Sequence, residues 1–238
     1  MRLELFIAGT DTGVGKTLVA TGILLALRAQ GFSVRGLKPV ASGAELTPDG
    51  WRNEDGLALQ AASVPPVDYA TVNPHCFEPA IAPHLAAERA QRPLELAALV
   101  AWYRRAAAGV DVVITEGAGG WRVPLHPGGF LSDLPEALGL DVVLVVGLRL
   151  GCLNHARLSY EAIAAGGKCR FAGWIGNPID PDFAELDANL TTLGRLLGGP
   201  PLAIVPRLDT RAATRVAQPF DGPGLLRRLR AGAAAPAT

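Results

Sequence analysis

The sequence predicts an α/β protein with a doubly wound, mostly parallel sheet that is covered by helices on both faces. Short apolar or β-branched runs alternate with helix-like segments along most of the 238 residues. Several of the runs are continuously apolar, which is typical of parallel strands buried on both sides. This alternation implies βαβ crossovers, and in such sheets ligands bind beyond the carboxyl ends of the strands.

The expected elements follow one another in a regular order. Strands are expected at residues 3–8, 33–38, 110–115, 141–147, 171–176 and 202–206. Helices are expected near residues 16–30, 54–63, 94–108, 154–166 and 184–197. The stretch 64–93 is proline-rich and has no clear period, so we expect an irregular excursion there with one short helix near 83–90.

The length and the cysteine content indicate how many domains the chain forms and whether it needs disulfides or a structural metal. Residues 1–231 are expected to form a single domain, and residues 232–238 a disordered tail. A chain of this length buries roughly 70–75% of its unfolded surface, so it needs no disulfide or structural metal to fold. The cysteines Cys76, Cys152 and Cys169 lack the number and spacing of a disulfide framework or a zinc site. We expect them to be reduced thiols.

Charge and hydropathy exclude some classes of partner. Lysine plus arginine and aspartate plus glutamate both number 22, which gives no support for binding to nucleic acid or an anionic membrane. No apolar run approaches the ~20 residues that span a bilayer, and the first residues lack a leader or cleavage site. We therefore expect a cytoplasmic protein in which local geometry, rather than net charge, binds any anion.

A glycine-rich loop, GTDTGVGKT at residues 9–17, follows the first predicted strand and opens the first predicted helix. The backbone N–H groups of such a loop favour phosphate oxygens. Lys16 would reach the outer phosphates of a nucleoside triphosphate, and the Thr17 hydroxyl would bind Mg²⁺. The usual spacing places a glycine at position 10, where this chain has Thr10, so Gly9 indicates a variant with one extra residue. The motif predicts a fold of the P-loop NTPase type.

A lysine and two acids flank predicted elements near this loop. Lys38 ends the second predicted strand, where it would be a second cation near the γ-phosphate, although an isolated lysine there could simply be solvated. Glu116 follows a buried strand, which is costly unless the carboxylate meets a metal or a cation. Asp55 lies in the first turn of a helix, where an acid also complements the helix dipole. Thr17, Asp55 and Glu116 would offer three oxygen ligands to an octahedral Mg²⁺.

The segment LGCLNHA at residues 150–156 follows another predicted strand and opens a helix. Its free N–H groups would suit a carboxylate, although Asn154 could simply be the cap of the helix. Cys152 and His155 could form a nucleophile–base pair. No partner acid accompanies them, so we disfavour this interpretation.

The chain resembles the dethiobiotin synthetase family in five motifs: GTDTGVGKT, LKPVASG, RNEDG, TEGAGGW and LGCLNHA. The resemblance runs from about residue 5 to residue 206. It implies a homodimeric P-loop enzyme that uses ATP and Mg²⁺ to carboxylate 7,8-diaminopelargonate with CO2 or bicarbonate. The implied reaction forms a carbamate on one amine and phosphorylates it to a mixed anhydride. Attack by the second amine then closes the ureido ring and releases ADP and phosphate.

The resemblance also implies roles for individual residues. Lys16 and Lys38 would neutralise carbamate and phosphate charge, and Thr12 would join them as a catalytic residue. The implied ATP-binding residues are Gly13, Val14, Gly15, Lys16, Thr17, Leu18, Asp55, Glu116, Gly117, Ala118, Gly119, Asn177, Pro178, Pro206, Arg207 and Leu208. The implied substrate-binding residues are Thr12, Lys38, Ser42 and, from the neighbouring subunit, Gly151, Cys152, Leu153 and Asn154. The implied magnesium ligands are Thr17, Asp55 and Glu116.

Two segments implied to contact the nucleotide base depart from the family pattern. Asn177-Pro178 stands where the family often has Asn-Asp, so the second contact could come only from the backbone. Arg207 lies between Pro206 and Leu208, where the family frequently has an aromatic residue. The adenine contacts implied by the resemblance are therefore altered in this chain.

Other classes of P-loop protein share the phosphate-binding loop. A switch ATPase of the partitioning or cell-division type typically has an extra lysine early in the loop, where this chain has Thr10, Asp11 and Thr12. The ATP-dependent half of a cobyrinate amidase would need a glutamine-hydrolysing domain, for which no chain length remains. We prefer the synthetase and keep the switch ATPase as the alternative.

Overall fold

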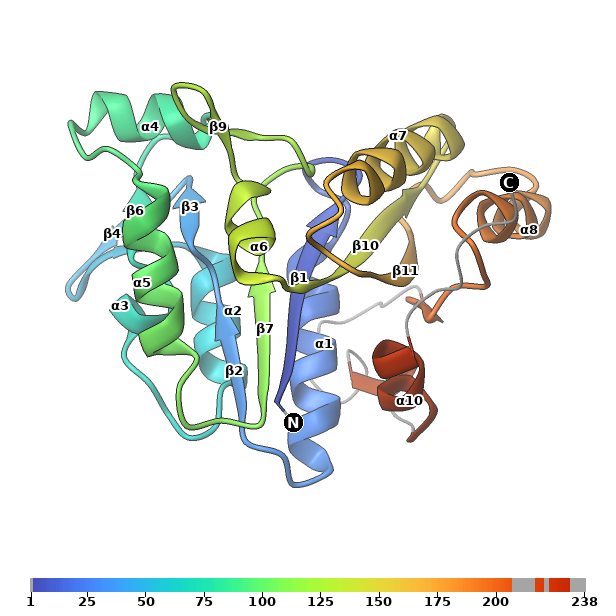
Figure 1. Ribbon diagram of the computed structural model, residues 1–238, viewed down its shortest axis with the longest axis horizontal. Helices are drawn as coiled ribbons and strands as arrows, with labels where there is room; N and C mark the ends of the chain where they lie inside the picture. The colour runs from blue at the N-terminus through green and yellow to red at the C-terminus, as the bar shows by residue number, and fades with distance from the viewer. Residues whose placement is uncertain (1, 207–216, 221–222, 232–238) are drawn as a thin grey trace.

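The computed structural model describes residues 2–206, 217–220 and 223–231. Within them, a six-stranded sheet has the order β12-β11-β10-β1-β7-β2, and every neighbouring pair is parallel. Its strands are β1 (Leu3–Gly9), β2 (Val34–Leu37), β7 (Val112–Glu116), β10 (Asp141–Leu148), β11 (Phe171–Pro178) and β12 (Ala203–Ile204). In Figure 1 the neighbouring strands β1, β7 and β2 point toward the same edge of the molecule. The predicted doubly wound, parallel sheet is confirmed.

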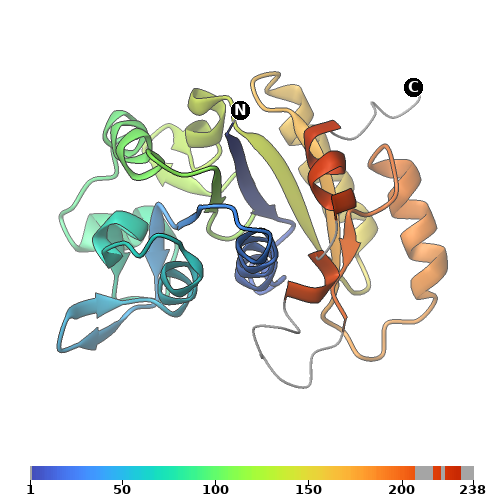
Figure 2. The ribbon, with the colours of Figure 1, turned by 90° about the horizontal axis from the view of Figure 1, so that it is seen from below.

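Helices cover both faces of this sheet, as Figure 2 shows from below. The helices of one face are α1 (Lys16–Ala29), α2 (Glu54–Ala62) and α10 (Pro223–Ala231), with the short 3₁₀ helix η1 (Gln218–Phe220) beside them. Those of the other face are α4 (Pro83–Arg89), α5 (Leu96–Ala106), α6 (Asp133–Leu138), α7 (Cys152–Ala165) and α8 (Leu186–Leu196). The arrangement gives the protein two hydrophobic cores, one on each side of the sheet.

Strand β1 demonstrates why continuous apolar runs mark the central strands. Leu5 and Ile7 are buried in the core with α1, while Phe6 and Ala8 are buried in the opposite core with α5 and α6. Because successive side chains of a strand point to opposite faces, a strand covered on both sides is apolar at every position.

Several small elements between the large ones were not predicted. They are the parallel pair β3 (Val40–Ser42) and β6 (His75–Phe77), the hairpin β4 (Glu45–Thr47) and β5 (Gly50–Arg52), the hairpin β8 (Pro124–His126) and β9 (Gly129–Phe130), and the helix α3 (Tyr69–Val72). Elements of two to four residues are too short to produce a hydrophobic period. The helix expected near 83–90 is confirmed as α4, but its flanks within 64–93 are more ordered than predicted.

Other differences concern the ends of elements. The helix expected at 154–166 begins at Cys152, and the strand expected at 202–206 pairs only over Ala203–Ile204. Helix α10 was not predicted. The expected disordered tail, residues 232–238, lies outside the described residues. In the part of the chain that the structure describes, no helix has the length and apolar character needed to cross a membrane.

Core packing generates the first prediction. Leu24 on α1 is 0% exposed, whereas Leu46 in the β4–β5 hairpin is 69% exposed. We predict that Leu24→Ala lowers the free energy of unfolding by about 2–5 kcal/mol, because the truncation leaves a cavity in the core. The matched change Leu46→Ala should cost less than about 0.5 kcal/mol. Urea denaturation measures both values, and equal losses would contradict the placement of α1 in the core.

Candidate active site

The loop between β1 and α1 requires glycine at three positions. Gly13 and Gly15 have φ angles of 75° and 89°, the left-handed conformation that side chains disfavour. A Cβ atom at Gly15 would lie 2.2 Å from the amide nitrogen of Asn177, and one at Gly9 would lie 2.9 Å from Val14 Cγ2. Gly9 therefore ends β1 at a place where only glycine fits, although it stands one position before the usual glycine. The loop leads into the N-terminus of α1, where the first N–H groups of the helix have no partner within it and can bind an anion.

Lys16 lies inside the curve of this loop. Its ammonium donates to the Asp11 carbonyl over 3.0 Å, and the residue is 7% exposed. Burial, assisted by repulsion from the Lys38 ammonium, lowers the pKa of Lys16 to about 8. A phosphate oxygen is a stronger acceptor than a carbonyl, so the loop holds Lys16 ready to bind one.

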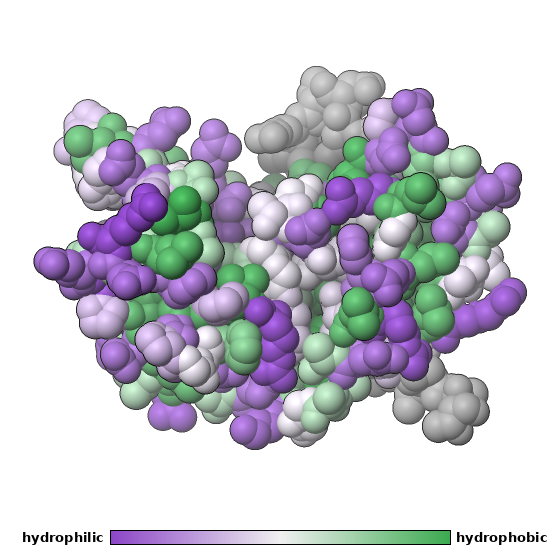
Figure 3. Space-filling view, turned by 90° about the horizontal axis from the view of Figure 1, so that it is seen from above, coloured by the Kyte–Doolittle hydropathy of each residue, from purple (hydrophilic) through white to green (hydrophobic). Residues whose placement is uncertain are grey.

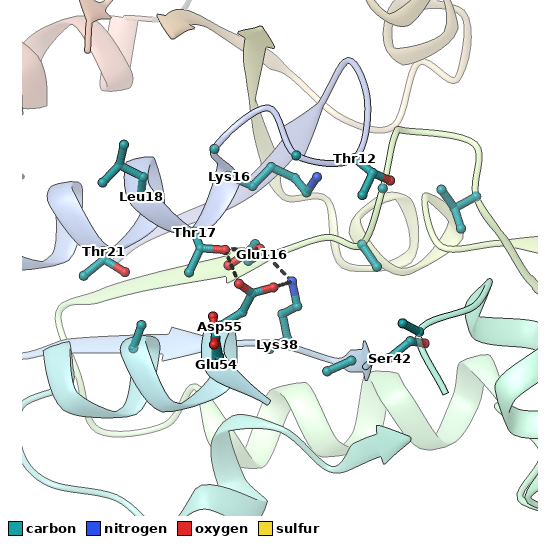
Figure 4. Close-up of a pocket in the computed structure, with 18 of the residues that line it drawn as sticks. Thr12, Lys16, Thr17, Leu18, Thr21, Lys38, Ser42, Glu54, Asp55 and Glu116 are labelled. Atoms are coloured by element: carbon teal, nitrogen blue, oxygen red, sulfur yellow. Dashed lines mark hydrogen bonds and ion pairs between the residues drawn. The ribbon is translucent and has the colours of Figure 1, made fainter. Parts of the chain in front are cut away.

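Lys38, immediately after β2, is surrounded by the acids predicted to bind metal (Figure 4). Its ammonium donates to Glu116 Oε1 over 2.6 Å and to Asp55 Oδ2 over 2.8 Å. The Thr17 hydroxyl lies 2.7 Å from Asp55 Oδ1 and 2.9 Å from Glu116 Oε1. Four residues from β7, α1, α2 and the end of β2 thus form one cluster, which we call the Lys38 cluster.

The protonation of the Lys38 cluster follows from burial and pairing. Burial alone would lower the pKa of Lys38, but the charges of Glu116 and Asp55 outweigh it and raise that pKa. For Asp55, burial acts against ionisation, yet Lys38 lowers the pKa below the usual value. Burial raises the pKa of Glu116, and Lys38 opposes that rise. Lys38 is therefore held charged between two carboxylates.

The cluster has the donor set of a magnesium site. Thr17, Asp55 and Glu116 contribute hydroxyl and carboxylate oxygens, which Mg²⁺ prefers as ligands. Glu116 Oε2 is buried without a hydrogen-bond partner among the described residues, which leaves it free to accept a further cation or donor. In the described ranges no group of three or more histidine, cysteine, aspartate or glutamate residues could hold a metal. Mg²⁺ suits a site with few protein ligands, because it usually keeps water and phosphate oxygens in its shell.

A cavity of about 1250 Å³ lies beyond the carboxyl ends of the strands and contains the cluster. Figure 3 looks onto this end, where the surface is hollowed between the flank of α4 and the flank of α7. Of the residues implied by the motifs, the cavity is lined by Thr12, Gly13, Gly15, Lys16, Thr17, Leu18, Lys38, Ser42, Asp55, Glu116, Ala118, Gly119, Asn177, Pro178 and Pro206. Val14 and Gly117 belong to the same loops without lining the cavity. Arg207 and Leu208 lie outside the described residues.

The cavity also has lining residues that sequence reasoning missed. They are Thr21, Glu54, Ala58, Ala80, Ile81, Ala82, Pro83 and Val123. Most are small or apolar and carry no chemical signal that a motif search could detect. Thr21 and Glu54 could have been found, because Thr21 lies one helical turn after Thr17 and Glu54 precedes Asp55.

Asn177, at the end of β11, ties the sheet to the phosphate-binding loop. It is 8% exposed, and its amide nitrogen donates to the Val14 carbonyl over 2.9 Å. One of its donors is therefore used within the protein. The rest of the side chain remains at the cavity wall, where Pro178 and Pro206 also lie.

The turn at the start of α7 does not line the cavity of its own chain. Gly151, with a φ angle of 94°, is the N-cap and the helix begins at Cys152, so the interpretation of Asn154 as the cap is wrong. Cys152 is 2% exposed, and burial raises the pKa of its thiol, which agrees with the rejection of Cys152 as a nucleophile. The Cys152 N–H donates to the Arg149 carbonyl over 3.0 Å, so this N–H group is already paired within the chain.

The parallel sheet, the glycine-rich loop and the acids at its mouth define a P-loop nucleotide-binding protein. Solved structures show the same fold. The septum site-determining protein MinD of Pyrococcus horikoshii, complexed with Mg-ADP, matches with a TM-score of 0.59 and 16% identity over 94% of each chain. A ParA family ATPase of Chlorobium tepidum matches with a TM-score of 0.57 and 14% identity over 96% of each chain.

Sequence comparison defines the family. A family model described as an AAA domain matches residues 4–215. The chain is 55% identical to the ATP-dependent dethiobiotin synthetase of Chromohalobacter salexigens, over 85% of this chain and 89% of the relative. It is 49% identical to the ATP-dependent dethiobiotin synthetase of Cellvibrio japonicus, over 91% of this chain and 94% of the relative. The chain belongs to the ATP-dependent dethiobiotin synthetase family, as the five motifs predict.

The Lys38 cluster generates a prediction for Thr17. Thr17→Val removes the hydroxyl and preserves the shape of the side chain, whereas Thr17→Ser keeps the hydroxyl. We predict that Thr17→Val lowers Mg²⁺-dependent ATP turnover at least about 10-fold, the scale of a disturbed metal shell. Thr17→Ser should stay near the parent protein in a coupled ADP-release assay. If the two variants turn over alike, the Thr17 hydroxyl is not a metal ligand.

Proposed function

We propose that the protein uses ATP and Mg²⁺ to close the ureido ring of dethiobiotin from 7,8-diaminopelargonate and CO2. The observation that carries this proposal is the 55% identity to a relative named ATP-dependent dethiobiotin synthetase. The Lys38 cluster at the mouth of the phosphate-binding loop supports it, because phosphoryl transfer needs cations around the transferred group.

The reaction needs phosphorylation because a carbamate oxygen is a poor leaving group. One amine adds to CO2 and loses a proton to give a carbamate, whose oxygen attacks the γ-phosphorus of ATP as ADP leaves. The second amine then attacks the carbamate carbon, phosphate departs, and the amine proton is lost to solvent. The protein contributes by holding three reactants in register within the cavity of about 1250 Å³.

Different residues of the chain would neutralise the negative charge on the phosphates and on the carbamate. Lys16 takes the outer phosphates, and Lys38, which is held charged, neutralises the carbamate and the phosphoryl group. Mg²⁺, held by Thr17, Asp55 and Glu116, would supply further positive charge to the phosphate oxygens. None of these groups needs to transfer a proton for the phosphoryl step.

Ser42 and Thr12 are assigned to the substrate amines or the carbamate. Ser42 Oγ is buried at the cavity without a hydrogen-bond partner among the described residues, so it is free to bond an incoming polar group. The Thr12 side chain lines the same cavity across from it. On the opposite side of the loop, we assign the base of ATP to Asn177, Pro178 and Pro206.

We further propose a homodimer in which each site takes the substrate carboxylate in the neighbouring α7 turn, at Gly151, Cys152, Leu153 and Asn154. The turn lies outside the cavity of its own chain, and its last N–H groups start a helix of 14 residues. Leu150 and Leu158, before and on α7, are 89% and 57% exposed, which suits a surface covered by a second subunit. A two-fold axis would give two equivalent sites.

The alternative of a partitioning-type switch ATPase is not favoured. The similarity to MinD and ParA proteins, at 14–16% identity, establishes the fold alone. The relatives with about half of their residues identical are named dethiobiotin synthetases.

A substrate-dependence assay tests the proposed function. We predict that ADP release requires both 7,8-diaminopelargonate and bicarbonate, because the acceptor of the phosphoryl group is the carbamate made from them. The matched reactions omit one component each. Turnover with ATP and Mg²⁺ alone, unchanged by the diamine, would favour the switch ATPase instead.

Mixed dimers test the shared site. Lys16→Met impairs the phosphate-binding loop, and Leu153→Pro removes one N–H from the first turn of α7, where N–H groups have no partner within the helix. In a mixed dimer one site has both defects and the other has neither, so activity should return to about half of the parent value per heterodimer. If subunit exchange is verified and no activity returns, the carboxylate site belongs to the same chain as the loop.

A further inference from the structure

A buried chain of hydrogen bonds runs behind the Lys38 cluster. The Tyr69 hydroxyl accepts the Asn53 backbone N–H over 2.8 Å and donates to Asn73 Oδ1 over 3.0 Å. The Asn73 amide nitrogen donates to the Lys38 carbonyl over 2.7 Å. Asn53, Tyr69 and Asn73 are 9%, 7% and 3% exposed, and none of them lines the cavity. The chain is therefore internal and would touch no substrate.

One end of this chain holds Asp55. Asn53 is the N-cap of α2, and its side-chain oxygen accepts the Asp55 N–H over 3.1 Å. Its amide nitrogen also lies 3.3 Å from the Ser42 carbonyl and 3.2 Å from the Gly43 carbonyl, and donates to both. Asn53 thus connects the helix that carries Asp55 to the strand end that carries Ser42.

The other end holds Lys38. The Lys38 N–H donates to the Val72 carbonyl over 2.8 Å, and its own carbonyl accepts from Asn73. The same Asn73 amide donates to the His75 carbonyl over 3.2 Å. Both backbone groups of Lys38 are therefore bound to residues 72–73, at the C-terminal end of α3.

The Tyr69 hydroxyl connects Asn53 at the Asp55 end of the hydrogen-bond chain to Asn73 at the Lys38 end, and it packs against Gly56 of α2. A Cβ atom at Gly56 would lie 2.8 Å from the Tyr69 hydroxyl oxygen, so glycine in the first turn of α2 admits the ring. The Arg52 guanidinium lies over the Tyr69 ring, 4.4 Å from its centroid. Burial raises the pKa of Tyr69, so the hydroxyl keeps the proton that it donates to Asn73.

We propose that Tyr69 and Asn73 are positioning residues that fix Lys38 relative to Asp55 and thereby set the rate of phosphoryl transfer. This inference rests on the proposed function. The two residues act through the backbone on the charged groups. Their side chains thus add a backbone route to the direct ion pair of 2.8 Å between Lys38 and Asp55 and to the link through Glu116 and Thr17. A small change in their separation would misplace the cation at the reacting phosphate.

Tyr69→Phe tests the proposal by deleting one oxygen atom. We expect kcat for diamine- and bicarbonate-dependent ADP release to fall about 10-fold or more, the scale found for groups that orient metal ligands. The KM for ATP should change much less, because Tyr69 does not line the cavity and its hydrogen bonds go to Asn53, Asn73 and Cys76 rather than to the phosphate-binding loop. Asn73→Ala breaks the same chain from its other end and should give a similar loss of kcat. The double variant should lose little more than the worse single variant, because both changes cut one chain of bonds.

Tyr103→Phe is the matched control. Tyr103 is 2% exposed and its hydroxyl donates to Glu4 Oε1 over 2.8 Å, away from the cavity. Tyr103→Phe should lower the free energy of unfolding about as much as Tyr69→Phe does, but it should leave kcat unchanged. If Tyr69→Phe and Asn73→Ala keep kcat within the range of the control, or lose it only through unfolding at the assay temperature, the positioning role is overturned. Absence of diamine-dependent turnover in the parent protein would overturn the proposed function instead.

Discussion

The ammonium of Lys38 lies 2.6 Å from Glu116 Oε1 and 2.8 Å from Asp55 Oδ2, and the geometry of the site depends on this contact. The Glu116 side chain is 1% exposed, so its charge would be very costly without a cation beside it. The pairing draws together the ends of β2 and β7 and the first turn of α2, and Thr17 adds α1. Ion pairs and hydrogen bonds of charged groups thus join four elements at the carboxyl edge of the sheet.

In the proposed reaction, Lys38 and Mg²⁺ would have to share the carboxylates of Asp55 and Glu116. In the proposed site Mg²⁺ would use the carboxylates that Lys38 contacts in this structure, so metal binding would share or replace those contacts. Any Lys38 contact given up to the metal becomes available to phosphate or carbamate oxygens at the cavity. Under this proposal, Lys38 would neutralise the acids before the nucleotide binds and would remain as a cation beside it afterwards.

The sequence allowed the sheet and the phosphate-binding loop to be predicted, because both leave local signals. Strands covered on both faces are continuously apolar, as in β1, and a loop that binds phosphate needs glycines such as Gly13 and Gly15 at fixed spacing. Glu116 was also identifiable, as an acid directly after a buried strand. The Asn53–Tyr69–Asn73 chain was not, because it lies partly in the proline-rich stretch 64–93 and depends on contacts between segments that have no shared period. The start of α7 was misplaced because Gly151 caps that helix through its backbone conformation, whereas Asn154 has the better capping side chain.

The most direct test of the central claim is a double-mutant cycle on Lys38→Met and Glu116→Gln, read as the free energy of unfolding without nucleotide. If the buried pair is ionised, Lys38→Met alone should cost about 3–5 kcal/mol, because it leaves Glu116 without its cation. Adding Glu116→Gln should recover part of that loss, and the exposed pair Arg157–Glu161 should couple by less than about 1 kcal/mol in the same experiment. Effects of Lys38→Met and Glu116→Gln that add to within about 0.5 kcal/mol would contradict the account.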